Sequence, residues 1–282
     1  YPNSGWDINY LNWEFLKNPF GHAKLFLAFH QSKLVGITTG IPLKIEINNY
    51  IFKGFRIQNV LTDFNYRGQG IFSNLLRKSN YYLDNNSDFN ITFPNRNSYP
   101  FFIKTNWTEV NKIPLFEKRL KNIEKIRINY EIVSKFKIEH QIIWKRNLKK
   151  NLDIVCNAKY LNWRFINNPK SIYYCFNMIN KNKLIGFIIL KRYVDEDGFK
   201  IGHVCKVVCP ERYFCDSIKF ANNYFLKLSF HKLSLWDNFH HNKLLNLNFK
   251  KIDLGELKYL FRTKKRMNGN KWLLSMSQSD VF

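Results

Sequence analysis

The stretch Val60–Leu76, VLTDFNYRGQGIFSNLL, decides how the chain folds. It begins as an apolar strand, turns through Arg67-Gly68-Gln69-Gly70 and continues with the apolar spacing of a helix. A strand that enters a helix through glycines leaves the first helical N–H groups unpaired and lets the backbone approach an anion closely. The turn therefore predicts a phosphate site to which Arg67 adds a cation. The alternative is an ordinary strand-to-helix turn.

A second feature of the sequence is an internal repeat. Tyr10–Pro19 (YLNWEFLKNP) recurs as Tyr160–Pro169 (YLNWRFINNP), with seven of ten positions identical. Each copy has the spacing of an amphipathic helix that Asn-Pro ends, since the residue before proline avoids helical angles. Lys33–Gly36 recurs at the same offset as Lys183–Gly186. The halves are therefore two copies of one unit, and their Tyr and Trp residues are expected to pack in a core rather than bind a ligand.

The order of elements predicts the fold class. Both copies read as a helix, antiparallel strands, a helix, a strand and a helix, which is typical of an α+β fold with a mixed, mostly antiparallel sheet flanked by helices. The predicted domains are residues 1–144 and 145–282. The segment 112–151, with a strand over 126–133, is expected to close the first sheet and link the copies. Val208–Phe214 of the second copy lacks the glycine turn, so only the first copy is predicted to bind phosphate.

The glycine turn resembles the motif of a known family. Arg67-x-x-Gly70-x-Phe72 is similar to the pyrophosphate-binding motif Arg/Gln-x-x-Gly-x-Gly/Ala of the GNAT acyltransferase superfamily, except at Phe72. Asn95, Phe102 and Asn106-Trp107 resemble the next element of that fold. The whole chain resembles tandem GNAT proteins encoded near genes for surface polysaccharides, in which Arg-Gly-x-Gly-Ile-Phe, Phe-Pro-Asn-x-x-Ser-Tyr and a terminal run, here 272–280, recur. In that subgroup Phe72 is the expected residue.

The resemblance implies a function. It implies an acetyl-CoA-dependent N-acyltransferase built from two tandem GNAT-like domains, the second degenerate, which acts on an amine such as a nucleotide-linked amino sugar for glycan biosynthesis. Such a transfer requires no metal, and none is predicted. The residues that the resemblance assigns to acetyl-CoA lie on the strand, on the turn and in the next element: Val60, Leu61, Thr62, Arg67, Gly68, Gln69, Gly70, Ile71, Phe72, Asn95 and Phe102.

The catalytic groups are less clearly marked by the sequence. GNAT enzymes often carry Tyr at the position of Phe102, which cannot donate a proton. Tyr99, about one helical turn earlier, is the predicted general acid, and packing at the helix start is its alternative role. Asp63 is predicted to accept the amine proton through water, and a turn residue is the alternative. Asp237 with His240 and His241 is a second candidate cluster, whose alternative is a helix cap beside solvated histidines.

The charge of the chain limits its partners. The sequence has 45 Lys and Arg against 21 Asp and Glu, a net charge of +24, which favours anionic partners. The basic residues are scattered except for the runs 145–150 and 262–266, and no recognised nucleic-acid motif accompanies them, so nucleic acid is not the expected partner. Two other functions remain open: a non-catalytic protein that binds CoA or a nucleotide sugar, and a transferase that takes its acyl group from aminoacyl-tRNA or an acyl carrier.

The cysteines and the hydropathy pattern predict the compartment. All five cysteines lie in the second half: Cys156, Cys175, Cys205, Cys209 and Cys215. An odd number without a signal segment favours free thiols, which are expected to be buried rather than metal ligands. No run approaches 18 consecutive apolar residues. We therefore expect a cytoplasmic protein, although the sequence begins without Met.

Overall fold

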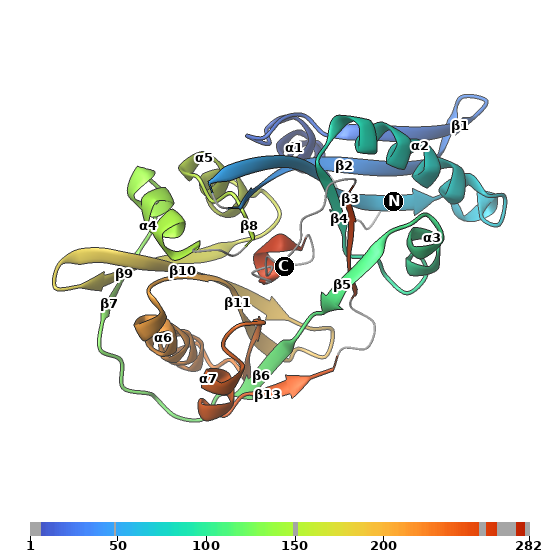
Figure 1. Ribbon diagram of the computed structural model, residues 1–282. Helices are drawn as coiled ribbons and strands as arrows, with labels where there is room; N and C mark the ends of the chain where they lie inside the picture. The colour runs from blue at the N-terminus through green and yellow to red at the C-terminus, as the bar shows by residue number, and fades with distance from the viewer. Residues whose placement is uncertain (1–6, 48, 149–151, 254–257, 264–274, 280–282) are drawn as a thin grey trace. The chain divides into compact units, whose positions relative to one another are not determined.

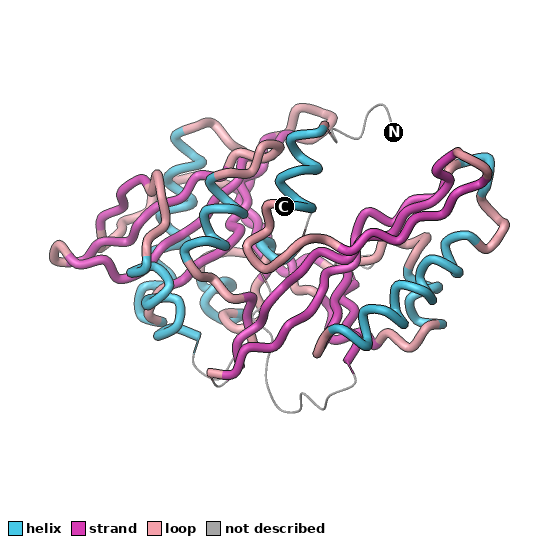
Figure 2. The backbone as a smooth tube through the Cα atoms, turned by 90° about the horizontal axis from the view of Figure 1, so that it is seen from above, coloured by secondary structure: helices cyan, strands magenta, loops and turns pink. Residues whose placement is uncertain are grey.

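The computed structural model describes residues 7–47, 49–148, 152–253, 258–263 and 275–279. They divide into two compact units, the first within residues 1–112 and 255–270 and the second within 113–254 and 271–282. Each unit has a mixed sheet with helices alongside its strands (Figures 1 and 2). The predicted fold class is confirmed. No helix among the described residues is long and apolar enough to cross a membrane.

The first unit has one mixed sheet. Its described elements, in chain order, are α1 (Ile8–Leu11), the π-helix η1 (Asn12–Leu16), β1 (Lys24–His30), β2 (Lys33–Ile47), β3 (Tyr50–Thr62), the 3₁₀-helix η2 (Phe64–Tyr66), α2 (Ile71–Asn86), β4 (Phe89–Thr92), α3 (Tyr99–Lys104), β5 (Thr108–Lys112) and β14 (Lys258–Thr263). Within this unit the strand order is β1-β2-β3-β4-β14-β5, and only β3 and β4 are parallel neighbours.

The second unit repeats this plan. Its described elements are β6 (Leu115–Arg119), β7 (Asn129–Ile132), α4 (Ile138–Leu148), β8 (Asp153–Ile154), α5 (Ala158–Leu161), the π-helix η3 (Asn162–Ile166), β9 (Tyr173–Asn180), β10 (Lys183–Val194), β11 (Lys200–Val208), the 3₁₀-helix η4 (Glu211–Tyr213), α6 (Phe214–Lys227), β12 (Lys232–Trp236), α7 (His241–Asn246), β13 (Lys250–Ile252) and the 3₁₀-helix η5 (Met276–Gln278). Its sheet has the order β13-β6-β12-β11-β10-β9-β7, again with one parallel pair, β11 and β12.

The repeated sequence folds alike in both copies. In each, one α-helical turn passes into a π-helix, and an Asx side chain caps the start: Asp7 Oδ1 accepts from the Tyr10 amide (2.7 Å), and Asn157 Oδ1 from the Tyr160 amide (2.8 Å). Both repeated Tyr–Trp pairs are buried. The interpretation of these aromatic residues as core is confirmed.

The closing strands are exchanged between the two halves of the sequence. β6 follows β5 closely but pairs with β12 and β13 in the second unit, while β14 pairs with β4 and β5 in the first. The prediction that 112–151 closes the first sheet is therefore wrong: Phe116 of β6 is buried in the second core, and β7 pairs with β9. The predicted division at residues 144 and 145 falls within α4 of the second unit.

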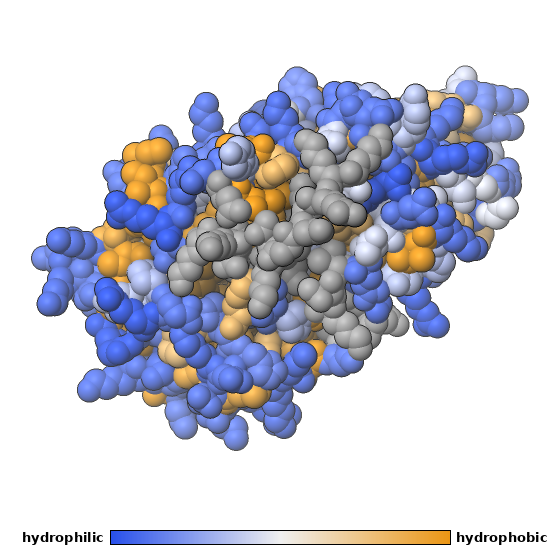
Figure 3. All heavy atoms as spheres, viewed as in Figure 1, coloured by the Kyte–Doolittle hydropathy of each residue, from blue (hydrophilic) through white to orange (hydrophobic). Residues whose placement is uncertain are grey.

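Two further expectations can be compared with the structure. All five cysteines are free, and Cys156, Cys175 and Cys205 are buried, as expected for structural thiols. Residues 272–274 and 280 of the terminal run lie outside the described residues, as do residues 264–266 of the basic run. On the face drawn in Figure 3 hydrophilic residues predominate, and the apolar patches between them are small.

Candidate functional site

The site in the first unit begins where two parallel strands stop pairing. β3 and β4 pair only as far as Ile57 and Thr92, while β3 continues to Thr62. Just beyond Ile57 the register of β3 with β2 shifts, and Asn59 has a φ of +53°. Such a bulge redirects the residues that follow it. The last residues of β3 therefore present backbone groups that β4 does not use.

A buried carboxylate holds this bulge. Glu14 is 2% exposed and accepts hydrogen bonds from the Tyr10 hydroxyl (3.0 Å), from Gln58 Nε2 and from Asn59 Nδ2 (3.0 Å). Gln58 Oε1 in turn accepts from Arg56 Nε. Because each partner satisfies a buried polar atom, the network fixes the backbone at Asn59. The first repeat helix thus supports the bulge, a role that the sequence did not indicate.

A pocket of about 540 Å³ lies beside the bulged strand and the glycine turn. Its walls come from the end of β3, the turn, the start of α2 and the loop into α3. The lining residues are Val60, Leu61, Thr62, Tyr66, Arg67, Gly68, Gly70, Ile71, Phe72, Ser73, Asn95, Asn97, Ser98 and Phe101. The strand, turn and helix of the opening stretch therefore meet at one pocket.

The turn has the geometry of an anion cradle. Gly68 and Gly70 have φ values of +78° and +74°, which favour glycine. No side chain caps α2, and its first backbone bond runs from the Asn74 amide to the Gly70 carbonyl (3.0 Å). The amides before Asn74 therefore lack a helical acceptor and carry the positive end of the helix dipole. Arg67 lines the same pocket, with Nε 3.4 Å from the Thr62 carbonyl oxygen.

Most of the residues assigned to the cofactor line this pocket, but two do not. Gln69 is outside its walls, and Phe102 is 1% exposed in the core, with its ring 5.2 Å from that of Trp107. Phe101, one residue earlier, is the aromatic side chain of α3 in the wall. A contact of Phe102 with the cofactor is therefore not supported by its position, because the helix turns that side chain inward.

Asn95 reaches the pocket, but its side-chain oxygen is already used. Oδ1 accepts from the amides of Asn97 (3.1 Å) and Ser98 (3.0 Å), which fixes the loop that leads into α3. Asn97 and Ser98 line the pocket too, as does Tyr66 beside the turn. None of these three was predicted from the sequence. An Asx turn after Asn95 was the signal that could have found the first two.

The two predicted catalytic residues are bonded elsewhere. The Tyr99 hydroxyl donates to Glu109 Oε2 (2.9 Å), and this bond raises the pKa of Tyr99. Asp63 pairs with Lys33 (2.9 Å) and accepts from the Asn65 amide (3.0 Å), and its bond to Lys33 lowers the pKa of Asp63. Neither residue lines the pocket. Their catalytic roles stay predictions.

The second unit has a smaller pocket at the same place in its sheet. β11 and β12 pair as far as Val204 and Leu235, and the residues that follow line a cavity of about 240 Å³. Here η4 runs directly into α6 without glycine, and no described residue between Val208 and Phe214 has a positive φ. The described part of this pocket has no counterpart of the phosphate turn.

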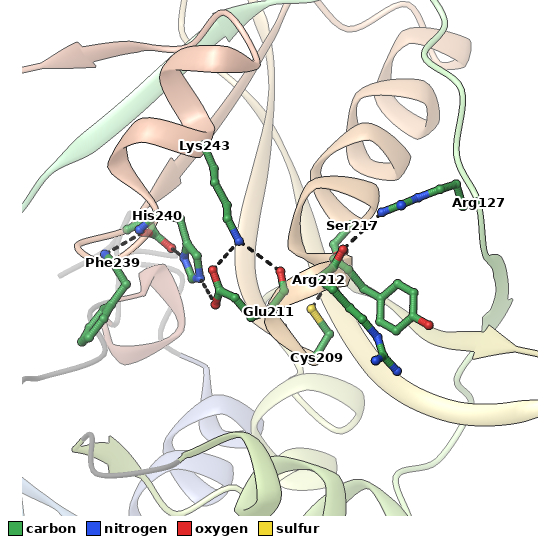
Figure 4. A network of polar contacts seen from close by, with 10 residues as sticks. Arg127, Cys209, Glu211, Arg212, Ser217, Phe239, His240 and Lys243 are labelled. Carbon is green, nitrogen blue, oxygen red and sulfur yellow. Dashed lines mark hydrogen bonds and ion pairs between the residues drawn. The ribbon is translucent and has the colours of Figure 1, made fainter.

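A polar network occupies the position of the missing turn (Figure 4). His240 lies between Asp237 (Nδ1 to Oδ2, 2.7 Å) and Glu211 (Nε2 to Oε2, 3.1 Å), and Lys243 pairs with Glu211. Burial lowers the pKa of His240, but the bond to Asp237 and the charge of Glu211 outweigh it and raise the pKa. Asp237 Oδ1 also accepts from the His240 amide (2.6 Å), as in the helix-cap alternative.

Two residues near this network, His241 and Cys209, do not add a catalytic group to it. His241 is exposed and contacts Phe116, 5.3 Å between ring centroids, rather than Asp237. Cys209 lines the pocket, but burial raises the pKa of its thiol to about 12, so that it is not a thiolate at neutral pH. The network therefore reads as a structural support at this strand end.

Comparison with known proteins shows which domain models and solved structures resemble this chain. Residues 6–110 match the model of the acetyltransferase (GNAT) domain. The fold is similar to a GCN5-related N-acetyltransferase from Anabaena variabilis (TM-score 0.68, 14% identity, 90% of this chain and 64% of that one). It is also similar to N-myristoyltransferase from Saccharomyces cerevisiae with bound myristoyl-CoA (TM-score 0.65, 12% identity, 92% of this chain and 70% of that one). A search of curated proteins found no match.

These comparisons fix the fold and the class of domain. Residues 6–110 of the first unit match the GNAT acetyltransferase domain model, and the fold is similar to that of the two solved structures. The chain spans about two thirds of the length of the Anabaena protein.

Proposed function

We propose that the protein is an N-acyltransferase that takes its acyl group, normally acetyl, from acyl-CoA bound in the first unit. The observation that carries the proposal is the meeting of the bulged strand end, the glycine turn and the uncapped start of α2 at one pocket. The pantetheine arm of acyl-CoA needs backbone groups to pair with, which the strand end offers. The pyrophosphate needs amides and a cation, which the turn and the helix start offer. The GNAT domain match over 6–110 covers all three of these features.

Each part of the pocket has a role in holding acyl-CoA. The amides at the start of α2 and the Arg67 guanidinium would bind the pyrophosphate. The backbone of Val60–Thr62, with which β4 does not pair, would pair with the amides of the pantetheine arm as an added strand would. An N–H of the same segment would donate to the thioester oxygen and stabilise the negative charge that develops there.

The reaction itself needs little more than positioning and proton transfer. The neutral amine nitrogen forms a bond to the thioester carbon, the C–S bond breaks, and the thiolate takes up a proton as the amine loses one. Tyr99 is the proton donor that we propose, because a phenol with its ordinary pKa of about 10 is protonated at neutral pH. The bond to Glu109 raises the pKa of Tyr99 further. Its hydroxyl must leave Glu109 to act. The amine proton would pass through water to Asp63, which would relay it to solvent because the lowered pKa of Asp63 does not let the carboxylate keep it at neutral pH.

The acceptor that we propose is the amino group of a nucleotide-linked sugar, in the cytoplasm. This choice is supported by the resemblance of the sequence motifs to tandem GNAT proteins encoded near genes for surface polysaccharides. A sugar amine with a modest pKa is partly neutral near pH 7 and needs no strong base.

Release of free thiol from acetyl-CoA, measured with a panel of nucleotide amino sugars, tests the proposal. We expect turnover with at least one member, and a weakening of acetyl-CoA binding by about tenfold or more in Arg67→Ala, since a charge-assisted contact is lost. Arg96→Ala is the matched control, because Arg96 lies in the loop before α3 but outside the pocket walls. Absence of both turnover and measurable affinity for CoA would contradict the proposal.

One observation favours a second candidate, a protein that binds acyl-CoA without transferring the acyl group. Both predicted proton-transfer residues are bonded outside the pocket, Tyr99 to Glu109 and Asp63 to Lys33. Tight binding of acetyl-CoA with no transfer to any amine in the panel would select this function.

A further inference from the structure

A third pocket lies in the second unit, beside the exchanged strand β6. It has a volume of about 840 Å³ and is formed by β6 and the loop after it, α6, β12, and the segment from the end of α7 into β13. Its lining residues are Glu117, Lys118, Arg119, Lys121, Asn122, Glu124, Lys219, Asn222, Lys232, Asn246, Leu247, Asn248, Lys250 and Ile252. None of them lines either pocket described above.

The lining of this basic pocket is strongly enriched in cations. Six of the fourteen lining residues are Lys or Arg, against 45 of 282 in the chain. Two of the six are neutralised, Lys118 by Glu124 and Lys232 by Glu117 (3.1 Å). The other four have no carboxylate partner among the described residues: Arg119, Lys121, Lys219 and Lys250. Four like charges around one hollow repel one another, and an anion in the pocket relieves this repulsion.

The wall that carries these cations is held in place. Asn223 on α6 accepts from the Glu124 amide (2.8 Å) and donates to the Glu124 carbonyl (2.7 Å). Asn222 Nδ2 donates to the Asn122 carbonyl (2.9 Å), and the Leu120 amide donates to the His231 carbonyl (3.0 Å). The loop after β6 is therefore fixed to α6 before any ligand arrives. Such preorganisation lowers the entropy that binding must overcome.

The same wall contains an unused acceptor. Asn222 is 1% exposed, and its Oδ1 has no hydrogen-bond partner among the described residues. A buried amide oxygen without a donor is unfavourable. The pocket thus combines four cations that have no carboxylate partner among the described residues with a buried polar side chain in the wall behind them.

We propose that the basic pocket binds the phosphate groups of a small nucleotide. Phosphate oxygens are the acceptors that clustered Lys and Arg recognise, and Arg119 can bind two of them at once. The amide side chains of Asn122, Asn246 and Asn248 can donate to and accept from a ribose or a base. The volume lies within the range of about 300–1,000 Å³ usual for small-ligand sites. This site is independent of the glycine turn and of the transferase activity.

Calorimetric titration of the full chain with ATP tests the proposal. We expect Lys219→Glu/Lys250→Glu to weaken ATP binding at least about tenfold. Lys135→Glu/Lys183→Glu is the matched control: it makes the same change in net charge, at exposed lysines of the same unit that line none of the three pockets. Arg67→Glu, which removes the cation of the first unit's turn, is expected to leave this binding within about threefold of the wild type.

Two competition experiments identify the recognised group. Inorganic tripolyphosphate is expected to displace ATP, because the phosphates provide the main contacts. Failure to displace it, or equal weakening of ATP binding by both double variants, would overturn the proposal. Tighter binding of a 20-nucleotide oligo(U) than of ATP, with a steep dependence on salt, would overturn it in favour of an RNA surface. Unchanged melting temperatures of the variants would show that charge, not folding, is altered.

Discussion

The hydroxyl of Tyr99 donates to Oε2 of Glu109, 2.9 Å away, and so joins the start of α3 to β5. Lys258 of β14 pairs with the other oxygen of Glu109 (3.2 Å), so the phenol belongs to a three-residue cluster on three elements. The Glu109 bond raises the pKa of Tyr99. An acid held in this way stays protonated at neutral pH but must rotate to reach a thiolate.

Tyr99→Phe tests the proposed acid. We expect kcat to fall by about 100-fold or more with the affinity for acetyl-CoA unchanged, because only proton donation is lost. Glu109→Gln keeps an acceptor for the hydroxyl but removes the charge, so it should lower the pKa of Tyr99 and move the alkaline limb of the kcat profile to lower pH. A Tyr99→Phe enzyme with normal kcat and a reduced melting temperature would assign the residue to packing.

Gly70→Ala should weaken acetyl-CoA binding. An added Cβ meets only Asn74 Nδ2, at 3.9 Å, so the effect arises from the φ of +74°, which disfavours any side chain by about 1–2 kcal/mol and shifts the turn. Gly198→Ala is the matched control, since Gly198 has a φ of +78° and open space in a hairpin of the second unit. We expect similar losses of stability in both variants, measured by urea unfolding, but loss of affinity only at Gly70. Equal affinities of the two variants for acetyl-CoA would show that Gly70 is not part of the binding site.

Asp63→Asn tests whether Asp63 acts as a base or only as a turn residue. Its pKa is lowered in the folded protein by the bond to Lys33, so the contribution of this pair to stability is present above the unfolded pKa and is lost as the pH falls through the lowered value. We expect the variant to lose this acid-side dependence of the melting temperature. If Asp63 accepts the amine proton, kcat also falls at neutral pH; an unchanged kcat would leave only the turn role.

Breaking the buried ion pair of Lys206 and Asp153 should destabilise the second unit. Nζ and Oδ2 are 2.7 Å apart, and both side chains are at most 5% exposed. Burial alone lowers the pKa of Lys206, but the Asp153 carboxylate outweighs it and raises the pKa. Lys206→Met leaves the buried carboxylate without its cation, with an expected loss of about 3–5 kcal/mol in urea unfolding. Adding Asp153→Leu to it should recover part of the loss; no recovery would contradict the pairing argument.

His240 should make the stability of the second unit depend on pH. Because its folded pKa is raised, its contribution is fully present below the unfolded pKa of about 6.5 and is lost as the pH rises through the folded value. Burial lowers the pKa of His203 to about 3. Its contribution to stability is therefore present above the unfolded pKa and is lost as the pH falls toward the lowered value. The melting temperature of His240→Gln should therefore approach that of the wild type at alkaline pH and fall below it near pH 6. A constant difference across this range would contradict the ion-pair network.

The elements themselves could be predicted from the sequence, and the pocket in part. β3 ends at Thr62 and α2 begins at Ile71, so the glycine turn lies where the strand, turn and helix pattern of the opening stretch put it. These features depend on local chemistry: alternation of apolar residues, positive φ at glycine and helix periodicity. The difference between Phe101 and Phe102 does not, because which of two adjacent aromatic side chains turns inward depends on packing against Trp107.

Features set by distant partners could not be predicted in this way. Nothing local in Leu115–Arg119 says which sheet the strand joins, because its partners β12 and β13 lie more than 100 residues later in the sequence. Glu14 lies in a helix whose repeat has Arg164 at the same position. Its burial depends on the distant partners Gln58 and Asn59, which the helix sequence does not indicate. Sequence patterns indicate the conformation that a segment prefers, not the distant residues that it contacts in the fold.

The exchange of β6 and β14 has a consequence for how the protein is made. Residues 1–112 can leave the ribosome complete and still lack the strand between β4 and β5, which arrives only with residues 258–263. The sheet of the first unit therefore stays incomplete until residue 263 has been translated, and the nascent chain exposes an open sheet edge meanwhile. Splitting the gene after residue 112 or 144 should yield two insoluble products, which regain a native fold only when both are synthesised together.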